Sequence, residues 1–222
     1  MNTESANVSG PSRRDYTLGE EIANSVIHGL GIGLSVAALV LLVAFAVLSG
    51  DPYRLASAIV YGISLVLAYT ASTLYHSFPQ PKVKHVFKIL DHCAIYVLIA
   101  GTYTPYCLVT VREDGGWRLF WIIWSLALIG IALEAFWAYR PRWLSAVVYL
   151  GMGWMVIGSI EALTANLAPA GVWLLVAGGL CYTVGTIFYV LKQVKYMHAV
   201  WHLWVVAGSV CHFLSVLLFV MR

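Results

Sequence analysis

The stretch GLGIGLSVAALVLLVAFAVL, Gly29–Leu48, runs for twenty residues without a charged side chain. A helix of about 20 apolar residues spans the roughly 30 Å hydrocarbon core of a bilayer. The apolar character extends back to Glu21, which makes the run too long for the core of a signal peptide, and no small-residue cleavage site follows it. We therefore predict a membrane-spanning helix over Glu21–Leu48.

Six further stretches meet the same test of length and apolarity. They are Tyr53–Tyr75, His85–Val109, Trp117–Ala138, Trp143–Glu161, Gly171–Leu191 and His198–Met221. Short segments rich in turn residues separate them, so consecutive helices are expected to be antiparallel neighbours. Small residues in GLGIG, GMGW and AGG predict close backbone approach. The sequence thus predicts an all-α membrane protein, a seven-transmembrane helix bundle over residues 21–222 that follows a polar tail of residues 1–20.

The composition supports a membrane protein. Of 222 residues, 61% are hydrophobic and 10% are charged, whereas a soluble domain has about 25% charged residues. A net charge of +3 is too small to indicate nucleic-acid binding. The four cysteines lie in apolar segments without CxxC spacing, so we expect small buried hydrophobic residues rather than disulfides or metal ligands.

Basic residues are distributed unevenly between the two sides of the predicted membrane. The amino-terminal tail and the even-numbered loops hold Arg13, Arg14, Lys82, Lys84, Lys88, Arg140, Arg142, Lys192 and Lys195, and the opposite side holds Arg54, Arg112, Arg118 and Arg222. Because cytoplasmic loops carry the excess of Lys and Arg, we expect a cytoplasmic amino terminus and an external carboxyl terminus.

Polar side chains from separate helices fall at this cytoplasmic end. His198 and His202 lie one turn apart, on one face of the last helix. The second helix ends in ASTLYHSFP, which contains His76, and the third begins near LDHCAIY, which contains Asp91. Ionisable groups inside a membrane are costly and usually face a partner or a water-filled cavity. Their shared depth therefore predicts a functional site.

Three neutral imidazoles with one open coordination position form a catalytic type of zinc site. We predict His76, His198 and His202 as metal ligands. Zinc lowers the pKa of a bound water to about 7, and Asp91 is predicted to orient that water or to accept its proton. Ser72, one turn before His76, either hydrogen-bonds the water, a substrate carbonyl or Asp91, or bonds back to its own helix.

Two other features at this end have alternative interpretations. His92 lies about 100° around the helix from Asp91; it either packs against neighbours, which we expect, or replaces one of the ligands. Glu21, Asn24 and His28 form one stripe on the first helix. This stripe either lines the site or braces the helix against its neighbours, and we expect bracing.

Three remaining polar residues are expected to lie outside the site. Glu134 is predicted to pair with a nearby arginine such as Arg140. His85 lies beside lysines and is expected to be solvated. His212 is ten residues beyond His202, about 15 Å along the helix, and so belongs to the other leaflet.

Four separated segments resemble the hemolysin III family: EEIANSVIHGLG, ASTLYHSFP, LDHCAIYVLIAGTYTPY and HAVWHLWVVAGSVCHF. These proteins are bacterial relatives of the progestin and adipoQ receptors, within a wider group that includes alkaline ceramidases. The likeness runs from about Leu18 to the carboxyl end and is strongest to the enterobacterial members.

The resemblance implies seven helices in the bacterial inner membrane, a cytoplasmic amino end and a zinc ion near the cytoplasmic side. It implies that His76, His198 and His202 bind the zinc and that Asp91 and Ser72 are the family aspartate and serine. The chain has no counterpart of the large amino-terminal domain of the adiponectin receptors, so we expect no hormone-receptor role.

The predicted function is zinc-dependent hydrolysis of a lipid-like amide or ester, with membrane lipids as partners. One alternative is a non-enzymatic sensor or homeostasis protein with structural zinc. The family name implies a pore-forming hemolysin, although few charged residues are available to line a pore. A proton-coupled transporter is disfavoured because the polar residues cluster at one end. Histidine ligation also suits copper, iron or nickel, and the sequence fixes neither the substrate nor the oligomeric state.

Overall fold

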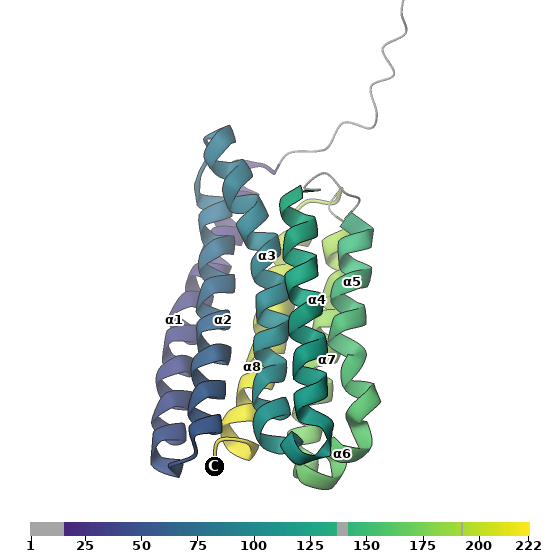
Figure 1. The fold of residues 1–222 in the computed structure, drawn as a ribbon. Coiled ribbons are helices and arrows are strands. Elements are labelled where there is room, and N and C mark those ends of the chain that lie inside the picture. The colour runs from purple at the N-terminus through teal and green to yellow at the C-terminus, as the bar shows by residue number, and fades with distance from the viewer. Residues whose placement is uncertain (1–15, 137–141, 192) are drawn as a thin grey trace, which may run out of the picture.

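The structure, a computed structural model, describes residues 16–136, 142–191 and 193–222. These residues form one bundle of helices packed side by side (Figure 1). The elements are α1 (Leu18–Ser49), α2 (Pro52–Ser77), α3 (Pro81–Pro105), the π-helical segments η1 (Tyr106–Thr110) and η2 (Arg112–Gly116), α4 (Trp117–Phe136), α5 (Arg142–Trp154), the 3₁₀ segment η3 (Met155–Ser159), α6 (Ile160–Asn166), α7 (Pro169–Val190) and α8 (Met197–Phe219). Within these ranges, seven spans are long and apolar enough to cross a membrane. The predicted seven-helix membrane bundle is confirmed.

Local capping residues explain where the first two helices begin and end. Thr17 and Glu20 form a capping box at the start of α1, in which the Glu20 carboxylate accepts a hydrogen bond from the Thr17 backbone N–H at 2.9 Å. The helix ends at Gly50, whose φ of 70° suits glycine. Asp51 then accepts a hydrogen bond from the Tyr53 backbone N–H at 2.8 Å and so caps α2.

The helices alternate in direction along the bundle. In Figure 1 the start of α1, the end of α2 and the start of α8 lie together at the upper end, and the carboxyl end of the chain lies at the lower end. The predicted cytoplasmic position of the upper end stays a prediction. Four of the basic residues that support it, Arg13, Arg14, Arg140 and Lys192, lie outside the described residues, as does the predicted end of the fourth span, Ala138.

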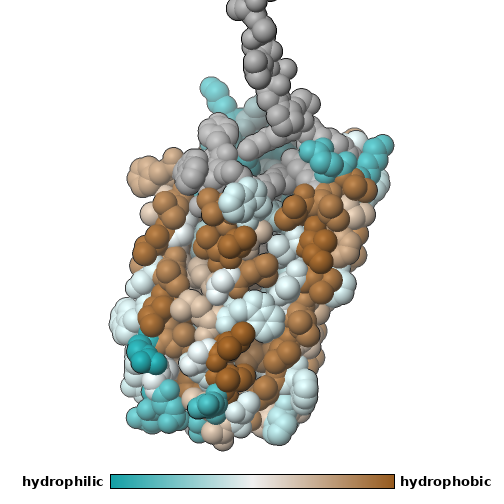
Figure 2. Space-filling model, turned by 90° about the vertical axis from the view of Figure 1, so that its right-hand side faces the viewer, coloured by the Kyte–Doolittle hydropathy of each residue, from teal (hydrophilic) through white to brown (hydrophobic). Residues whose placement is uncertain are grey.

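Apolar side chains cover the middle of the bundle surface. Figure 2 shows hydrophobic residues over much of one face and hydrophilic residues gathered near its two ends. Val40, Trp121 and Leu128 are each more than 60% exposed. Because this much exposed apolar surface is unfavourable in water, it is suited to contact with lipid.

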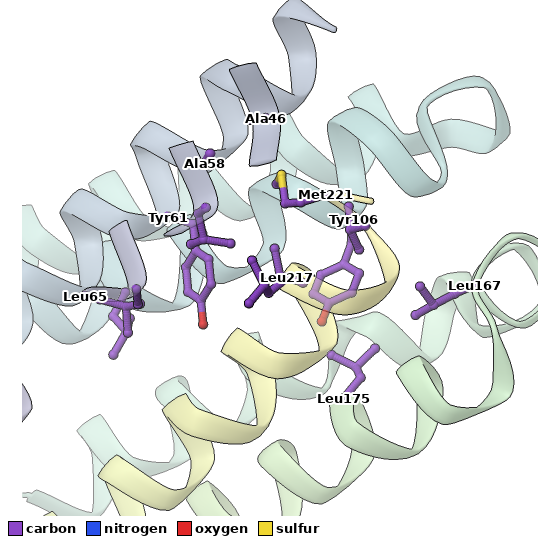
Figure 3. Packing of buried hydrophobic residues seen from close by; sticks show 14 of the residues in the cluster. Ala46, Ala58, Tyr61, Leu65, Tyr106, Leu167, Leu175, Leu217 and Met221 are labelled. Atoms are coloured by element: carbon purple, nitrogen blue, oxygen red, sulfur yellow. The ribbon is translucent and has the colours of Figure 1, made fainter. Parts of the chain in front are cut away.

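A buried apolar cluster holds the lower half of the bundle together. Tyr61 of α2, Tyr106 of η1 and Leu217 of α8 pack in this cluster (Figure 3). All four cysteines lie within the described ranges and are free thiols. Cys107 is fully buried, as expected, whereas the other three cysteines are only half-buried.

Two of the three glycine segments predicted to allow close helix approach do so. A Cβ atom on Gly31 would lie 2.5 Å from the Tyr69 ring, and one on Gly178 would lie 2.6 Å from the His212 ring. Neither glycine of GMGW has such a neighbour within 4 Å among the described residues. The expectation of close backbone approach at the GMGW glycines is therefore wrong.

The fifth span is longer and less regular than predicted. The prediction was Trp143–Glu161, but the span continues to Asn166 and is interrupted by η3. Glycines before and within the break weaken the regular helix there.

The hydroxyl of Tyr103 satisfies backbone groups at this break. It donates a hydrogen bond to the Gly153 carbonyl oxygen at 2.7 Å and lies 2.9 Å from the Met152 carbonyl oxygen. It accepts a hydrogen bond from the Val156 N–H at 2.8 Å. A broken helix is tolerated inside a membrane protein where neighbouring groups bind the freed backbone in this way.

We predict that Tyr103→Phe lowers stability because backbone groups at the break lose their partner. Each buried polar group left without a partner costs about 1–3 kcal/mol. Thermal unfolding in detergent should show a lower Tm for this variant than for wild type. Tyr53→Phe, at an exposed ring, is the matched control and should leave the Tm unchanged; equal Tm values for all three proteins would contradict the role given to Tyr103.

Candidate metal centre

Three buried histidines meet at the upper end of the bundle. His76 lies at the end of α2, and His198 and His202 lie in the first two turns of α8. Each offers one ring nitrogen, and these three nitrogens lie within 4.8 Å of one another. All three residues are less than 10% exposed. The predicted ligand set is therefore brought together.

The start of α8 is held in place by the start of α1. The Glu20 carboxylate accepts a hydrogen bond from the backbone N–H of Tyr196 at 3.0 Å. Tyr196 itself has a φ of 61° and precedes the first turn of α8. This contact fixes where α8 begins, and with it the depth of His198 and His202.

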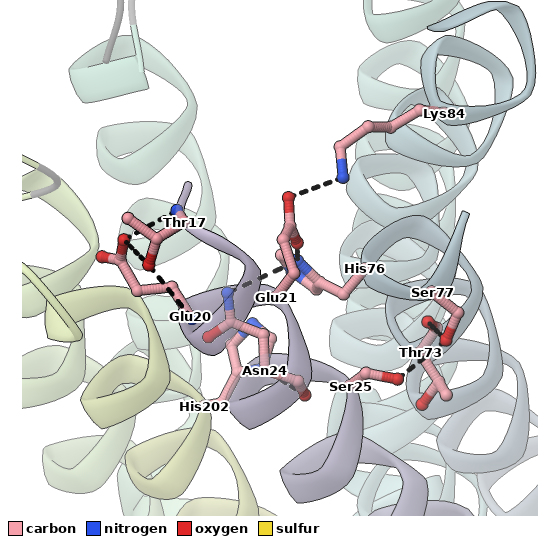
Figure 4. Close-up of polar contacts among 10 residues, drawn as sticks. All are labelled: Thr17, Glu20, Glu21, Asn24, Ser25, Thr73, His76, Ser77, Lys84 and His202. Atoms are coloured by element: carbon pink, nitrogen blue, oxygen red, sulfur yellow. Dashed lines mark hydrogen bonds and ion pairs between the residues drawn. The ribbon is translucent and has the colours of Figure 1, made fainter. Parts of the chain in front are cut away.

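A carboxylate from α1 binds the outer nitrogen of His76. The Nδ1 atom of His76 lies 2.6 Å from Glu21 Oε2, and Lys84 Nζ lies 2.6 Å from Glu21 Oε1 (Figure 4). The Asn24 side-chain amide lies farther from His76 Nδ1, at 3.4 Å. Because a carboxylate accepts, His76 Nδ1 donates to Glu21, which leaves the lone pair of Nε2 for a metal.

In His202, as in His76, a hydrogen bond at Nδ1 leaves Nε2 free to face the cluster. Its Nδ1 atom lies 3.3 Å from the backbone carbonyl oxygen of Asn24. A carbonyl oxygen only accepts, so Nδ1 carries the proton and Nε2 keeps its lone pair.

The donor set fits a zinc-type ion. His76 Nε2 is buried and has no hydrogen-bond partner among the described residues, which is unfavourable unless another group binds it. Zn–N bonds are about 2.0–2.1 Å long, and small side-chain movements would gather nitrogens that already lie within 4.8 Å of one another. A hydrogen bond from the opposite nitrogen to a carboxylate or carbonyl is the usual arrangement of histidine ligands.

A small cavity of about 40 Å³ lies beside the cluster. Asp91 of α3 and Ser72 of α2 line it together with His198 and His202. Ser72 and Asp91 come from different helices, so the cavity brings their side chains to one space. The cavity lining is mostly apolar but includes these polar groups, and the cavity is large enough for a water molecule. The two residues predicted to act on water are thus placed beside the predicted ligands.

The stripe on α1 lines the site and does more than brace the helix. Glu21 and Asn24 contact His76 and His202, as described above. His28, one turn further along, stacks on the His202 ring with 3.6 Å between centroids and 9° between planes. The sequence showed that the three residues share a face, but not which helix that face meets.

Glu134 of α4 contacts His92 of α3, and the predicted pairing of Glu134 with an arginine such as Arg140 stays a prediction. The Glu134 Oε1 atom lies 2.7 Å from His92 Nδ1, whereas Arg140 lies outside the described residues. His92 also lines the cavity beside Asp91, so its role is more than the expected packing. The relative register of α3 and α4, which decides this pair, is not visible in the sequence.

The two remaining histidines lie away from the cluster, as expected. His85 is exposed near the start of α3. His212 lies in the lower half of α8, where its ring stacks on Tyr182 with 5.5 Å between centroids.

Comparison with known proteins identifies the family. The family model described as Haemolysin-III related matches residues 16–213. The chain belongs to this family. It is 45% identical over 207 residues to the Hemolysin-3 homolog of Bacillus subtilis (strain 168), which covers 93% of this chain and 97% of that protein. It is 46% identical over 202 residues to Hemolysin-3 of Bacillus cereus, covering 91% and 92%.

A more distant relative comes from human. The chain is 28% identical over 177 residues to the human Monocyte to macrophage differentiation factor, which covers 76% of this chain and 72% of that protein. The family resemblance noted in the sequence is thus confirmed, and the protein is a multi-pass membrane protein. The narrower likeness to enterobacterial members stays a prediction.

We predict that Glu21→Gln weakens zinc binding, because the amide cannot accept a hydrogen bond from His76 as strongly as a carboxylate does. Loss of such an outer partner typically costs about 10- to 100-fold in metal affinity. The affinity is measured by competition with a chromophoric chelator in detergent. Glu161→Gln, at an exposed carboxylate near the other end of the bundle, should bind zinc as wild type does. An unchanged affinity in Glu21→Gln would contradict this role.

Proposed function

We propose that this haemolysin III protein is a zinc-dependent hydrolase that cleaves an amide or ester bond of a lipid-like substrate. The observation that carries the proposal is that Asp91 and Ser72 line one small cavity together with His198 and His202. A carboxylate and a hydroxyl beside three histidine donors form the arrangement expected for metal-assisted hydrolysis.

Different residues of the chain would have different roles in hydrolysis. Zinc, when bound, supplies a Lewis acid and an activated water. Asp91 accepts the proton of the attacking water and returns it to the leaving nitrogen or oxygen, so the products are a carboxylic acid and an amine or alcohol. The Ser72 hydroxyl orients the Asp91 carboxylate. The bundle itself keeps bulk water away from the reacting groups.

The site is suited to substrates that arrive from the membrane. The cluster lies in spans whose outward faces are apolar, and the described part of the chain carries no separate soluble domain. A substrate with a long apolar chain is concentrated where these spans lie.

We predict that Asp91→Asn retains zinc but lowers kcat by about 10²- to 10⁴-fold, the range expected when a general base is lost. The assay is a panel of lipid amides and esters tested with purified protein in detergent. Asp51→Asn, which changes only the cap of α2 at the far end, should keep wild-type kcat.

Two results would contradict the hydrolase proposal. One is full turnover of a verified substrate by Asp91→Asn. The other is wild-type protein that binds zinc but turns over no member of the panel.

A second candidate is a structural metal that braces the bundle in a non-enzymatic protein. The observation that favours it is that the three histidines come from two helices, and that two of them donate hydrogen bonds to a third helix. In that case zinc removal would lower the Tm strongly while no substrate is turned over. The hydrolase proposal expects turnover in addition.

A further inference from the structure

His28 is a buried histidine without a hydrogen bond. It is 6% exposed, and neither Nδ1 nor Nε2 has a partner among the described residues. Leaving a buried polar ring in this state is unfavourable. A group of this kind persists where water or a ligand supplies the missing partner.

Two ring contacts hold the His28 side chain in one orientation. The ring stacks on His202, with 3.6 Å between centroids and 9° between planes. It also meets the edge of the Tyr69 ring at 5.0 Å and 87°. Gly31, one turn further along α1, has no Cβ, which lets α1 approach Tyr69 closely. The ring is thus fixed by packing, although its nitrogens are not fixed by hydrogen bonds.

The stacking also separates His28 from the metal ligands. The His28 ring is nearly parallel to the His202 ring and offset from it, with 3.6 Å between centroids. His28 is accordingly absent from the histidine group whose nitrogens converge, which is His76, His198 and His202.

The cavity beside the cluster is a space in which a bound molecule could hydrogen-bond the His28 ring nitrogens. His28 lines the same 40 Å³ cavity as Ser72 and Asp91. A hydroxyl, a carboxylate and an imidazole therefore surround one small space next to two of the predicted ligands. A neutral imidazole carries one N–H donor and one acceptor nitrogen, so it can bind an oxygen atom held there.

We propose that His28 is a ligand-positioning residue, and that one of its ring nitrogens donates a hydrogen bond to a carbonyl or carboxylate oxygen bound beside the three-histidine cluster. This inference rests on the proposed function, because it assumes that the cluster holds zinc and presents it to an acyl group. It assigns to His28 the recognition of the acyl oxygen, a task different from metal binding and from the proton transfer given to Asp91.

The test uses acetohydroxamate, a small acyl compound that binds zinc through oxygen. Its affinity for the zinc-loaded protein in detergent is measured by isothermal titration calorimetry, and the zinc content of each variant is measured separately. His28→Phe keeps a flat ring for stacking on His202 but removes both nitrogens. His28→Asn restores an N–H donor. His212→Phe is the control, because His212 is buried in the same membrane domain but does not line this cavity.

The expected result is that His28→Phe retains zinc and binds acetohydroxamate at least about tenfold more weakly, since hydrogen bonds to charged groups are the stronger ones. His28→Asn should recover most of the affinity, and His212→Phe should bind as wild type does. If His28→Phe is not recovered folded, His28→Leu and His212→Leu make the same comparison.

Two outcomes would overturn the inference while leaving the proposed function intact. One is wild-type affinity in His28→Phe with zinc retained, which would make His28 a packing residue only. The other is loss of zinc from His28→Phe, which would make His28 a metal ligand or its support. A wild-type protein that binds no zinc would instead overturn the proposed function, on which this inference rests.

Discussion

The hydrogen bond between His76 Nδ1 and Glu21, at 2.6 Å, links the first two helices at the level where the three histidines meet. An ionisable pair in an apolar bundle is costly unless each partner is satisfied, and Lys84 satisfies the other carboxylate oxygen. The same helix binds His202 through the Asn24 carbonyl. Helix α1 therefore sets which nitrogen of His76 and which nitrogen of His202 faces the centre of the cluster.

These contacts from α1 both hold the helices together and orient the histidines on which the proposed chemistry depends. Neighbouring polar contacts reinforce them: Ser25 and Ser77 bond between α1 and α2 at 2.7 Å (Figure 4), and Glu20 binds the backbone before α8. The helix that supports the histidine cluster also brings His28 to its edge. One face of α1 thus orients ligands and lines the cavity, while its opposite face is apolar and exposed.

The sequence was sufficient to predict the membrane spans and the meeting of the three histidines. Apolar length and i, i+4 spacing are local signals that can be read from the sequence alone. It was insufficient for Glu21, since an acidic residue in a first helical turn also suits the helix dipole and so has a simpler explanation. The His92–Glu134 pair depends on the register between two helices, which no local pattern encodes. The closely spaced glycines of the fifth span indicate the helix break there. The same glycines are also typical of a close crossing between two helices, so the sequence does not distinguish the two.

The most direct test of the account is the metal content of the purified protein. Mass spectrometry of wild type and His202→Ala, with His212→Ala as the matched control on the same helix, measures zinc per chain. The account predicts about one zinc per chain in wild type and in His212→Ala, and a large loss in His202→Ala. The same stoichiometry in all three proteins, or no metal in wild type, would contradict it.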